Sequence, residues 1–165
     1  PKSLETLLEN NSKYIQITPL VCNYENLSLP DSSIDLIVGS GILSYADLSK
    51  TITEFSRVLK SGGFLILIDS LNNNLIYRWN RYFRYILRLR SKSTIIRIPK
   101  FEDFDKFKFQ FIELQKRTFG TFSFLYPPLK FLTGRSLSNY ILENMDKSIK
   151  LREYGFKIVY VGEKR

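Results

Sequence analysis

The chain has 165 residues, 44% of them hydrophobic and 15% aromatic, which is enough for one globular domain with its own core. It has no histidine and one cysteine, Cys22, which excludes an internal disulfide and a histidine base among these residues and disfavours a zinc site. The net charge of +9 favours anionic partners such as phosphorylated substrates, lipid headgroups or nucleic acid. The single cysteine favours the reducing cytoplasm, and no apolar run is long enough to span a bilayer.

The first residues are expected to form a short helix and then a strand. Leu4, Leu7 and Leu8 have helical spacing. Residues 14–22 follow as an apolar, β-rich run that ends at Asn23.

Residues 27–69 have the pattern of a strand, a helix and a second strand. Turn-forming residues at 30–33 precede the apolar run 34–38, which predicts the first strand. A helix is predicted by apolar residues at helical spacing, namely Leu48, Ile52, Phe55 and Leu59. Asp47 is placed to cap it, and Ser61-Gly62-Gly63 to end it. The apolar run 64–68 then completes a βαβ unit, in which the crossover is right-handed.

Two motifs in this stretch resemble those of the class I S-adenosylmethionine-dependent methyltransferases. Residues 27–37, LSLPDSSIDLI, are similar to the family's LPFPDNSFDLV. Residues 54–63, EFSRVLKSGG, are similar to its E-xx-RVLKPGG, with Ser61 in place of the usual proline. The resemblance implies transfer of a methyl group from S-adenosylmethionine to a small molecule, since these motifs are commonest in that branch. It also implies an α/β, Rossmann-like, mostly parallel sheet with an antiparallel last strand.

The resemblance further implies that the chain is the C-terminal portion of such a domain. Residues 1–4, PKSL, look like the end of the junction that follows the family's second strand. The Gly-rich cofactor motif that precedes this junction in the family is not in the sequence. Residues 1–165 are therefore expected to form a partial, N-terminally truncated methyltransferase domain.

Cofactor contacts are expected, by resemblance, from two turns. Counting back from Asp35 places Asn23 where the family usually has an aspartate that accepts a hydrogen bond from the adenine amino group, and Tyr24 comes next. An Asn oxygen accepts the same bond without a charge, and an ordinary turn role for Asn23 is an equal alternative. The second turn, beside the methionine end of the cofactor, is Gly39-Ser40-Gly41.

That second turn follows the first strand of the βαβ unit. In open α/β sheets ligands bind at this carboxyl edge, and glycines allow a close approach to the backbone. Catalytic candidates beyond the turn are Tyr45 and Asp47, with Asp69 as a further candidate base, and Tyr45 would line the substrate side. Many methyl transfers need only positioning and desolvation, because the sulfonium donor is already activated.

The segment from Ser70 to Phe101 contains no acidic residue. Within residues 76–92, one helical stripe is basic: Arg78, Arg81, Arg84 and Arg88. The opposite stripe is apolar: Ile76, Trp79, Phe83, Ile86 and Leu87. The pattern predicts a basic amphipathic helix capped by one of three consecutive asparagines, 72–74.

Three interpretations of this helix stay open. It packs on the domain with a solvated basic face, it docks on anionic lipid, or it holds an anionic substrate through Arg78, Arg81 and Arg84. No nucleic-acid-binding motif accompanies it, which disfavours nucleic acid. By resemblance, residues of about 70–120 would form a substrate lid or insertion.

The remaining elements are a strand, an aromatic loop or broken helix, a last helix and a closing strand; their ranges are 109–114, 122–132, 137–145 and 156–162. Besides the enzyme, two other functions are compatible with the sequence. One is a degenerate, non-catalytic interaction module, and the other is a membrane-surface or anion-binding module built on residues 76–92.

Overall fold

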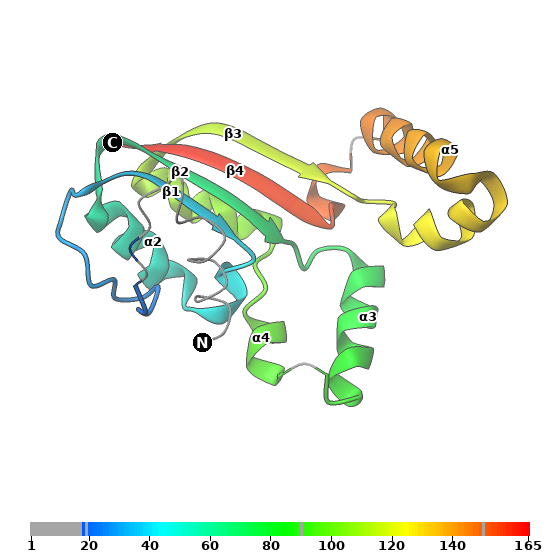
Figure 1. Cartoon of the computed structure of the whole chain (residues 1–165), viewed down its shortest axis with the longest axis horizontal. Helices are drawn as coiled ribbons and strands as arrows, with labels where there is room; N and C mark the ends of the chain where they lie inside the picture. The colour runs from blue at the N-terminus through cyan, green and yellow to red at the C-terminus, as the bar shows by residue number, and fades with distance from the viewer. Residues whose placement is uncertain (1–17, 19, 90, 150) are drawn as a thin grey trace.

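The computed structural model describes residues 18, 20–89, 91–149 and 151–165. These residues form a four-stranded sheet with the strand order β1-β2-β4-β3 (Figure 1). The strands are β1 Ile34–Ser40, β2 Leu59–Ser70, β3 Phe111–Phe119 and β4 Lys157–Lys164. The predicted strands at 34–38, 64–68 and 156–162 are confirmed, and the strand predicted at 109–114 begins instead at Phe111 and extends to Phe119.

The predicted βαβ unit is present. Helix α2, Leu48–Val58, joins β1 to β2, and the Asp47 side chain caps it by accepting a 3.0 Å hydrogen bond from the Lys50 amide. The glycines do not end the helix but shape the start of β2: Gly62 has a φ of +75°, and a Cβ at Gly63 would lie 2.9 Å from the Lys60 carbonyl oxygen. The chain can therefore enter β2 directly after α2.

The expected α/β class is confirmed, and the sheet is mixed in the part of the chain that the structure describes. There β1 and β2 pair in parallel, whereas β4 is antiparallel to both β2 and β3. The reason is that β1–α2–β2 is the single βαβ crossover among the residues that the structure describes. The antiparallel last strand is confirmed.

The predicted strand at residues 14–22 is not seen in its described part. Residues 20–22 are not in a strand, and Asn23 belongs to a turn that closes on Asn26. The predicted N-terminal helix and most of this predicted strand lie outside the described residues.

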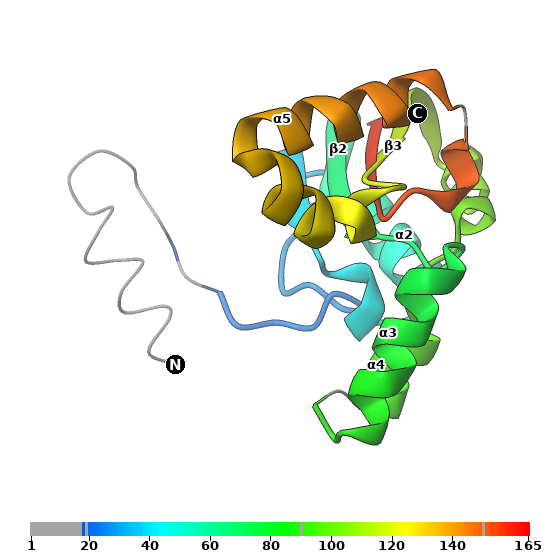
Figure 2. The same ribbon diagram turned by 90° about the vertical axis from the view of Figure 1, so that its right-hand side faces the viewer.

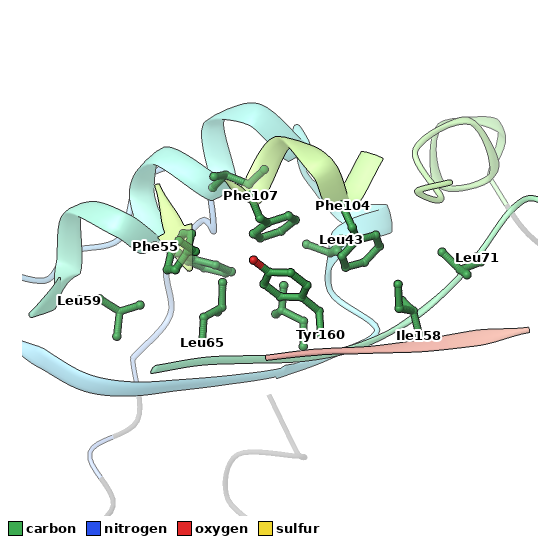
Figure 3. Close-up of a cluster of buried hydrophobic side chains, with 12 residues drawn as sticks. Leu43, Phe55, Leu59, Leu65, Leu71, Phe104, Phe107, Ile158 and Tyr160 are labelled. Atoms are coloured by element: carbon green, nitrogen blue, oxygen red, sulfur yellow. The ribbon is translucent and has the colours of Figure 1, made fainter. Parts of the chain in front are cut away.

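One face of the sheet carries the core (Figure 3). Phe55 of α2 and the 3-10 segment η2, Phe101–Phe109, pack over it, with Phe104 and Phe107 fully buried. Tyr160 of β4 points between these two rings, its centroid 4.7 Å from that of Phe107. Residues 101–119 of the expected lid region thus belong to the core and the sheet.

The opposite face of the sheet also carries apolar side chains. Leu36 and Val38 of β1, Phe64 of β2 and Ile112 of β3 lie on it and are 43–64% exposed. Among the described residues, α2 and η2 cover only the face that bears the core.

Two helices project beyond the end of β2, as Figures 1 and 2 show: α3, Leu75–Ile86, and α4, Lys92–Ile96. Residues 126–132 of the region predicted as a loop or broken helix join the predicted last helix in one bent element, α5, Tyr126–Ser148, which has Pro127-Pro128 in its first turn. It bends at Gly134, where φ is +76°. No helix in the described part of the chain is long and apolar enough to cross a bilayer.

Candidate cofactor and acceptor site

The two sequence motifs meet through charged side chains. The Arg57 guanidinium on α2 donates to both carboxylate oxygens of Glu54, at 2.7 and 3.0 Å. It also donates to the carbonyl oxygens of Leu27 and Leu29, both at 3.0 Å, and pairs with Asp31. The Leu27 amide in turn donates to Glu54 at 2.6 Å. Glu54 and Arg57 thus clamp the first motif onto α2 and direct the chain into β1.

Arg57 also sets the ionisation of Glu54. The hydrogen bond from Arg57 lowers the pKa of Glu54, against the opposing effect of its burial. The clamp is therefore an ion pair at neutral pH. Its residues support the fold and do not lie among the predicted site residues.

A second carboxylate fixes the loop that follows β1. Asp69, near the end of β2, is 3% exposed and accepts hydrogen bonds from the amides of Leu43 at 2.9 Å and Ser70 at 2.8 Å. Burial raises the pKa of Asp69, and these amide bonds oppose the rise. Both oxygens are engaged with backbone, so Asp69 holds the loop rather than standing free as a base.

The turn at the carboxyl end of β1 is partly open. Gly39 is closely packed, since a Cβ there would lie 2.5 Å from Ile42 Cδ1. Gly41 has a φ of +68°, its amide donates to the Ile68 carbonyl oxygen at 2.9 Å, and a Cβ there would meet nothing within 4 Å. Ser40 between them is exposed. The open backbone at Ser40 and Gly41 fits a ligand that approaches the chain closely.

The turn that carries Asn23 and Tyr24 lies at the start of α2. The Asp47 amide donates to the Glu25 carboxylate at 2.7 Å, and Lys50 pairs with Glu25 at 3.6 Å. The Asn23 side-chain oxygen accepts from the Glu25 amide at 3.0 Å, which is the ordinary turn role that the sequence left open. Asn23 and Tyr24 are both exposed.

The two candidate catalytic residues differ in their surroundings. Asp47 caps α2, and the hydrogen bond from the Lys50 amide holds its pKa below the usual range. A carboxylate with a lowered pKa is a weak proton acceptor, so the geometry favours a positioning role for Asp47. Tyr45 is 65% exposed in the short 3-10 segment η1, Leu43–Tyr45, and its carbonyl oxygen accepts from Arg97 at 3.3 Å.

The three arginines predicted to hold an anionic substrate do not act together. Arg81 is 6% exposed and donates to the Leu71 carbonyl oxygen at 2.7 Å and to Asn72 at 3.3 Å. Because its guanidinium is committed to the protein, the assignment of Arg81 to an exposed anion is corrected. Arg78 and Arg84 are exposed.

A groove of about 500 Å³ runs between α3 and α4. Trp79, Tyr82 and Arg78 of α3 line it, with Ile95 and Ile96 of α4 opposite. The 3.3 Å bond from Arg97, at the end of α4, to Tyr45 joins this hairpin to the loop after β1. The groove is thus connected through α4 to the edge that carries the predicted cofactor turn.

The contacts that attach the hairpin were not predicted from the sequence. Asn74 caps α3, and its side-chain amide donates to the carbonyl oxygens of Thr121 at 3.2 Å and Tyr154 at 2.9 Å. The Tyr77 hydroxyl donates to the Gly120 carbonyl oxygen at 3.2 Å. The sequence indicated only that Asn74 was one of three candidate caps. A local sequence pattern does not show that Asn74 and Tyr77 contact residues more than 40 positions away.

Comparison with known proteins agrees with this geometry. Residues 1–67 match a family model described as a methyltransferase domain. The YcgJ protein of Bacillus subtilis superposes with a TM-score of 0.59 at 18% identity, over 99% of this chain and 77% of that one. A SAM-dependent methyltransferase from Thermotoga maritima gives a TM-score of 0.56 at 18% identity, over 88% of this chain and 63% of that one.

The fold is that of the SAM-dependent methyltransferases. This confirms the resemblance stated on the two motifs. Demethylmenaquinone methyltransferases of Listeria welshimeri and Listeria monocytogenes are 37% identical to the chain over 75 residues. That match covers 42% of this chain and 31% of each relative, so the chain spans about a third of the length of these curated relatives. In this methyltransferase fold, the matched stretch includes β1, its following loop and α2.

Proposed function

We propose that the chain takes part in transfer of a methyl group from S-adenosylmethionine to a small-molecule acceptor in the cytoplasm. The observation that carries this proposal is the match of residues 1–67 to a methyltransferase domain, because the matched stretch contains the turn after β1, where the backbone of Gly41 is open. The curated relatives act, by their names, on demethylmenaquinone, which supports a small-molecule acceptor.

In this proposal the loop after β1 receives the cofactor. Ser40 and Gly41 would lie beside its methionine end, and the turn of Asn23 and Tyr24 beside its adenine. The bound sulfonium supplies an activated methyl group. Asp69 keeps the loop in place through the Leu43 amide, so the backbone is set before the ligand arrives.

The acceptor would enter from the groove between α3 and α4. Its lining is mostly apolar, with Trp79, Tyr82 and Ile96, and carries one cation, Arg78. This combination suits an acceptor with an apolar body and an anionic group. Tyr45 would line the acceptor side, and the protein's main contributions would be orientation and exclusion of water.

Calorimetric titration with S-adenosylmethionine tests the proposal. It should be carried out on the 165-residue chain and on any longer form of the protein that has residues before Pro1. We expect binding, and a loss of affinity of at least about tenfold for Gly41→Ala, because a methyl group would fill the open backbone. If neither form binds, the enzyme is rejected in favour of the non-catalytic interaction module.

Gly134→Ala provides a matched control. Gly134 has a φ of +76° against +68° at Gly41, and a Cβ at either position would meet nothing within 4 Å. The two substitutions therefore impose similar backbone strain. An equal loss of affinity in both variants would mean that Gly41 acts only through stability.

A further inference from the structure

The α3–α4 hairpin turns its apolar side chains outward. Trp79, Tyr82, Phe83 and Ile86 of α3, Leu89 after it, and Ile96 of α4 form what we call the apolar patch; each is 53–70% exposed. Figures 1 and 2 show the two helices projecting away from the sheet. An outward apolar surface on a projecting element marks a contact with something else.

This orientation is imposed by polar contacts at the base of α3. Tyr77 and Arg81 lie one turn apart on the side that meets the sheet end. The Tyr77 ring packs against that of Phe156 at a tilt of 31°, with the centroids 4.3 Å apart, and the Arg81 guanidinium donates to the Leu71 carbonyl oxygen. The stripe opposite to them carries Trp79 and Phe83 and therefore faces away.

The charge around the apolar patch has a single sign. Arg84, Arg88 and Lys92 are exposed on the hairpin, and no acidic residue occurs between Ser70 and Phe101. A partner that covers the patch must accept apolar groups and positive charge together. A second copy of the chain would bring basic surface against basic surface, which opposes pairing.

We propose that the α3–α4 hairpin docks on the surface of an anionic lipid bilayer. The apolar patch would enter the boundary between headgroups and acyl chains, where Trp and Tyr are favoured, and Arg84, Arg88 and Lys92 would pair with the lipid phosphates. Trp79, Tyr82 and Ile96 of the apolar patch also line the α3–α4 groove, so the groove would open at the bilayer surface. Docking does not involve the cofactor turn, so it can be tested separately from the binding of S-adenosylmethionine.

Trp79 makes the proposal directly measurable, because it is the single tryptophan of the chain and belongs to the apolar patch. The 165-residue chain is mixed with vesicles of phosphatidylglycerol and phosphatidylcholine, or with vesicles of phosphatidylcholine alone. Docking predicts co-sedimentation with the anionic vesicles and a blue shift of the Trp79 emission. Both effects should weaken as salt is added, since salt screens the attraction between arginines and headgroups.

Two double variants, each with a matched control, separate docking from non-specific adsorption to the vesicles. Phe83→Ser with Ile86→Ser should lower vesicle affinity at least about tenfold, because two inserted side chains are lost. Phe131→Ser with Leu132→Ser is the matched control on α5, where these side chains are 90% and 76% exposed, and it should leave the affinity unchanged.

A second double variant tests whether the basic side chains of the hairpin contribute to vesicle binding. Arg84→Glu with Lys92→Glu should lower the affinity at least about tenfold, since each charge near an anionic surface strengthens binding. The control, Arg135→Glu with Lys147→Glu on α5, should have little effect. Circular dichroism checks that each variant is folded. If the apolar variant does not fold, the charged variant still tests the proposal.

Any of four results would overturn the proposal. The first is the absence of binding to anionic vesicles, the second is equal binding to neutral vesicles, and the third is equal loss of affinity in the α5 controls. The fourth is a blue shift of Trp79 that depends on protein concentration without lipid, which would assign the patch to a contact between copies. None of these results depends on S-adenosylmethionine, so they leave the proposed methyl transfer as it stands.

Discussion

Helices α2 and α3 have similar amphipathic sequences but opposite orientations. In α2 the apolar side chains Ile52 and Phe55 are 4% and 2% exposed and pack on the sheet, while Lys50 and Thr53 face solvent. In α3 the buried side chain is Arg81, and Trp79 is 70% exposed. The same helical period therefore leads to a core face in one helix and to an outward apolar face in the other.

The difference arises from what each helix finds at its position in the chain. Helix α2 connects two parallel strands along the chain, and this crossover places it over the apolar face of the sheet. Helix α3 leaves the end of β2, where its neighbours are backbone carbonyls such as those of Leu71 and Gly120. Carbonyl acceptors attract Arg81 and Tyr77, and the apolar stripe is left outside.

The largest expected effect is the loss of stability when a buried apolar side chain of α2, rather than an exposed one of α3, is truncated. Phe55→Ala should lower the free energy of unfolding by about 3–5 kcal/mol, because it leaves a cavity in the core. Phe83→Ala, which removes the same atoms from a side chain 60% exposed, should change it by no more than about 0.5 kcal/mol. Urea unfolding of both variants measures this. Equal losses would show that α3 buries its apolar face in solution.

The sequence was sufficient for the elements whose partners are close along the chain. Residues 34–68 specify a strand, a capped helix and a strand, and each local signal agrees with the next, from Asp47 at the cap to the apolar run of β2. The period also predicted α3, with Asn74 as one of its candidate caps, but the single helix predicted over residues 76–92 is wrong in its second half: α3 ends at Ile86, and α4 begins at Lys92.

What the sequence could not show was which face of α3 is inside. That depends on Asn74 meeting Thr121 and Tyr154, and on Tyr77 meeting Gly120, which are contacts between residues far apart in the chain. For Asn23 the sequence left a turn role and an adenine contact open, because the residue type alone does not distinguish a backbone contact from a ligand contact. The prediction that Arg81 binds an anionic substrate was wrong for the same reason, since its guanidinium donates to a backbone carbonyl oxygen. The cap role of Asp47 was predicted and is confirmed.

The next effect concerns the charged clamp that holds α2. Glu54→Gln should lower the free energy of unfolding by about 1–3 kcal/mol at pH 7, because Arg57 loses a charged partner. The folded-state pKa of Glu54 lies below its ordinary value of 4.5. Its ionised form thus stabilises the fold above about pH 4.5, and this contribution disappears as the pH falls through the folded-state pKa.

Urea unfolding across the acidic range tests this sign. The difference in stability between the unmodified chain and Glu54→Gln should be constant near neutral pH and shrink below pH 4.5. Glu143→Gln, on the exposed part of α5, is the control and should show no such convergence. A difference that grew on acidification would contradict the ion pair.

A loss of stability of similar size is expected when the attachment of α3 is broken. Arg81→Met keeps much of the side-chain volume but loses the bond to the Leu71 carbonyl oxygen, so it should cost about 1–3 kcal/mol and leave that oxygen buried without its donor. Arg84→Met, at an exposed position one turn away, should cost no more than about 0.5 kcal/mol. Hydrogen exchange of the α3 amides reads out the attachment directly: exchange should accelerate in Arg81→Met, since a helix exposed on most of its surface has few other contacts. Equal protection in both variants would mean that α3 is held by its apolar side chains, and the contrast with α2 would then disappear.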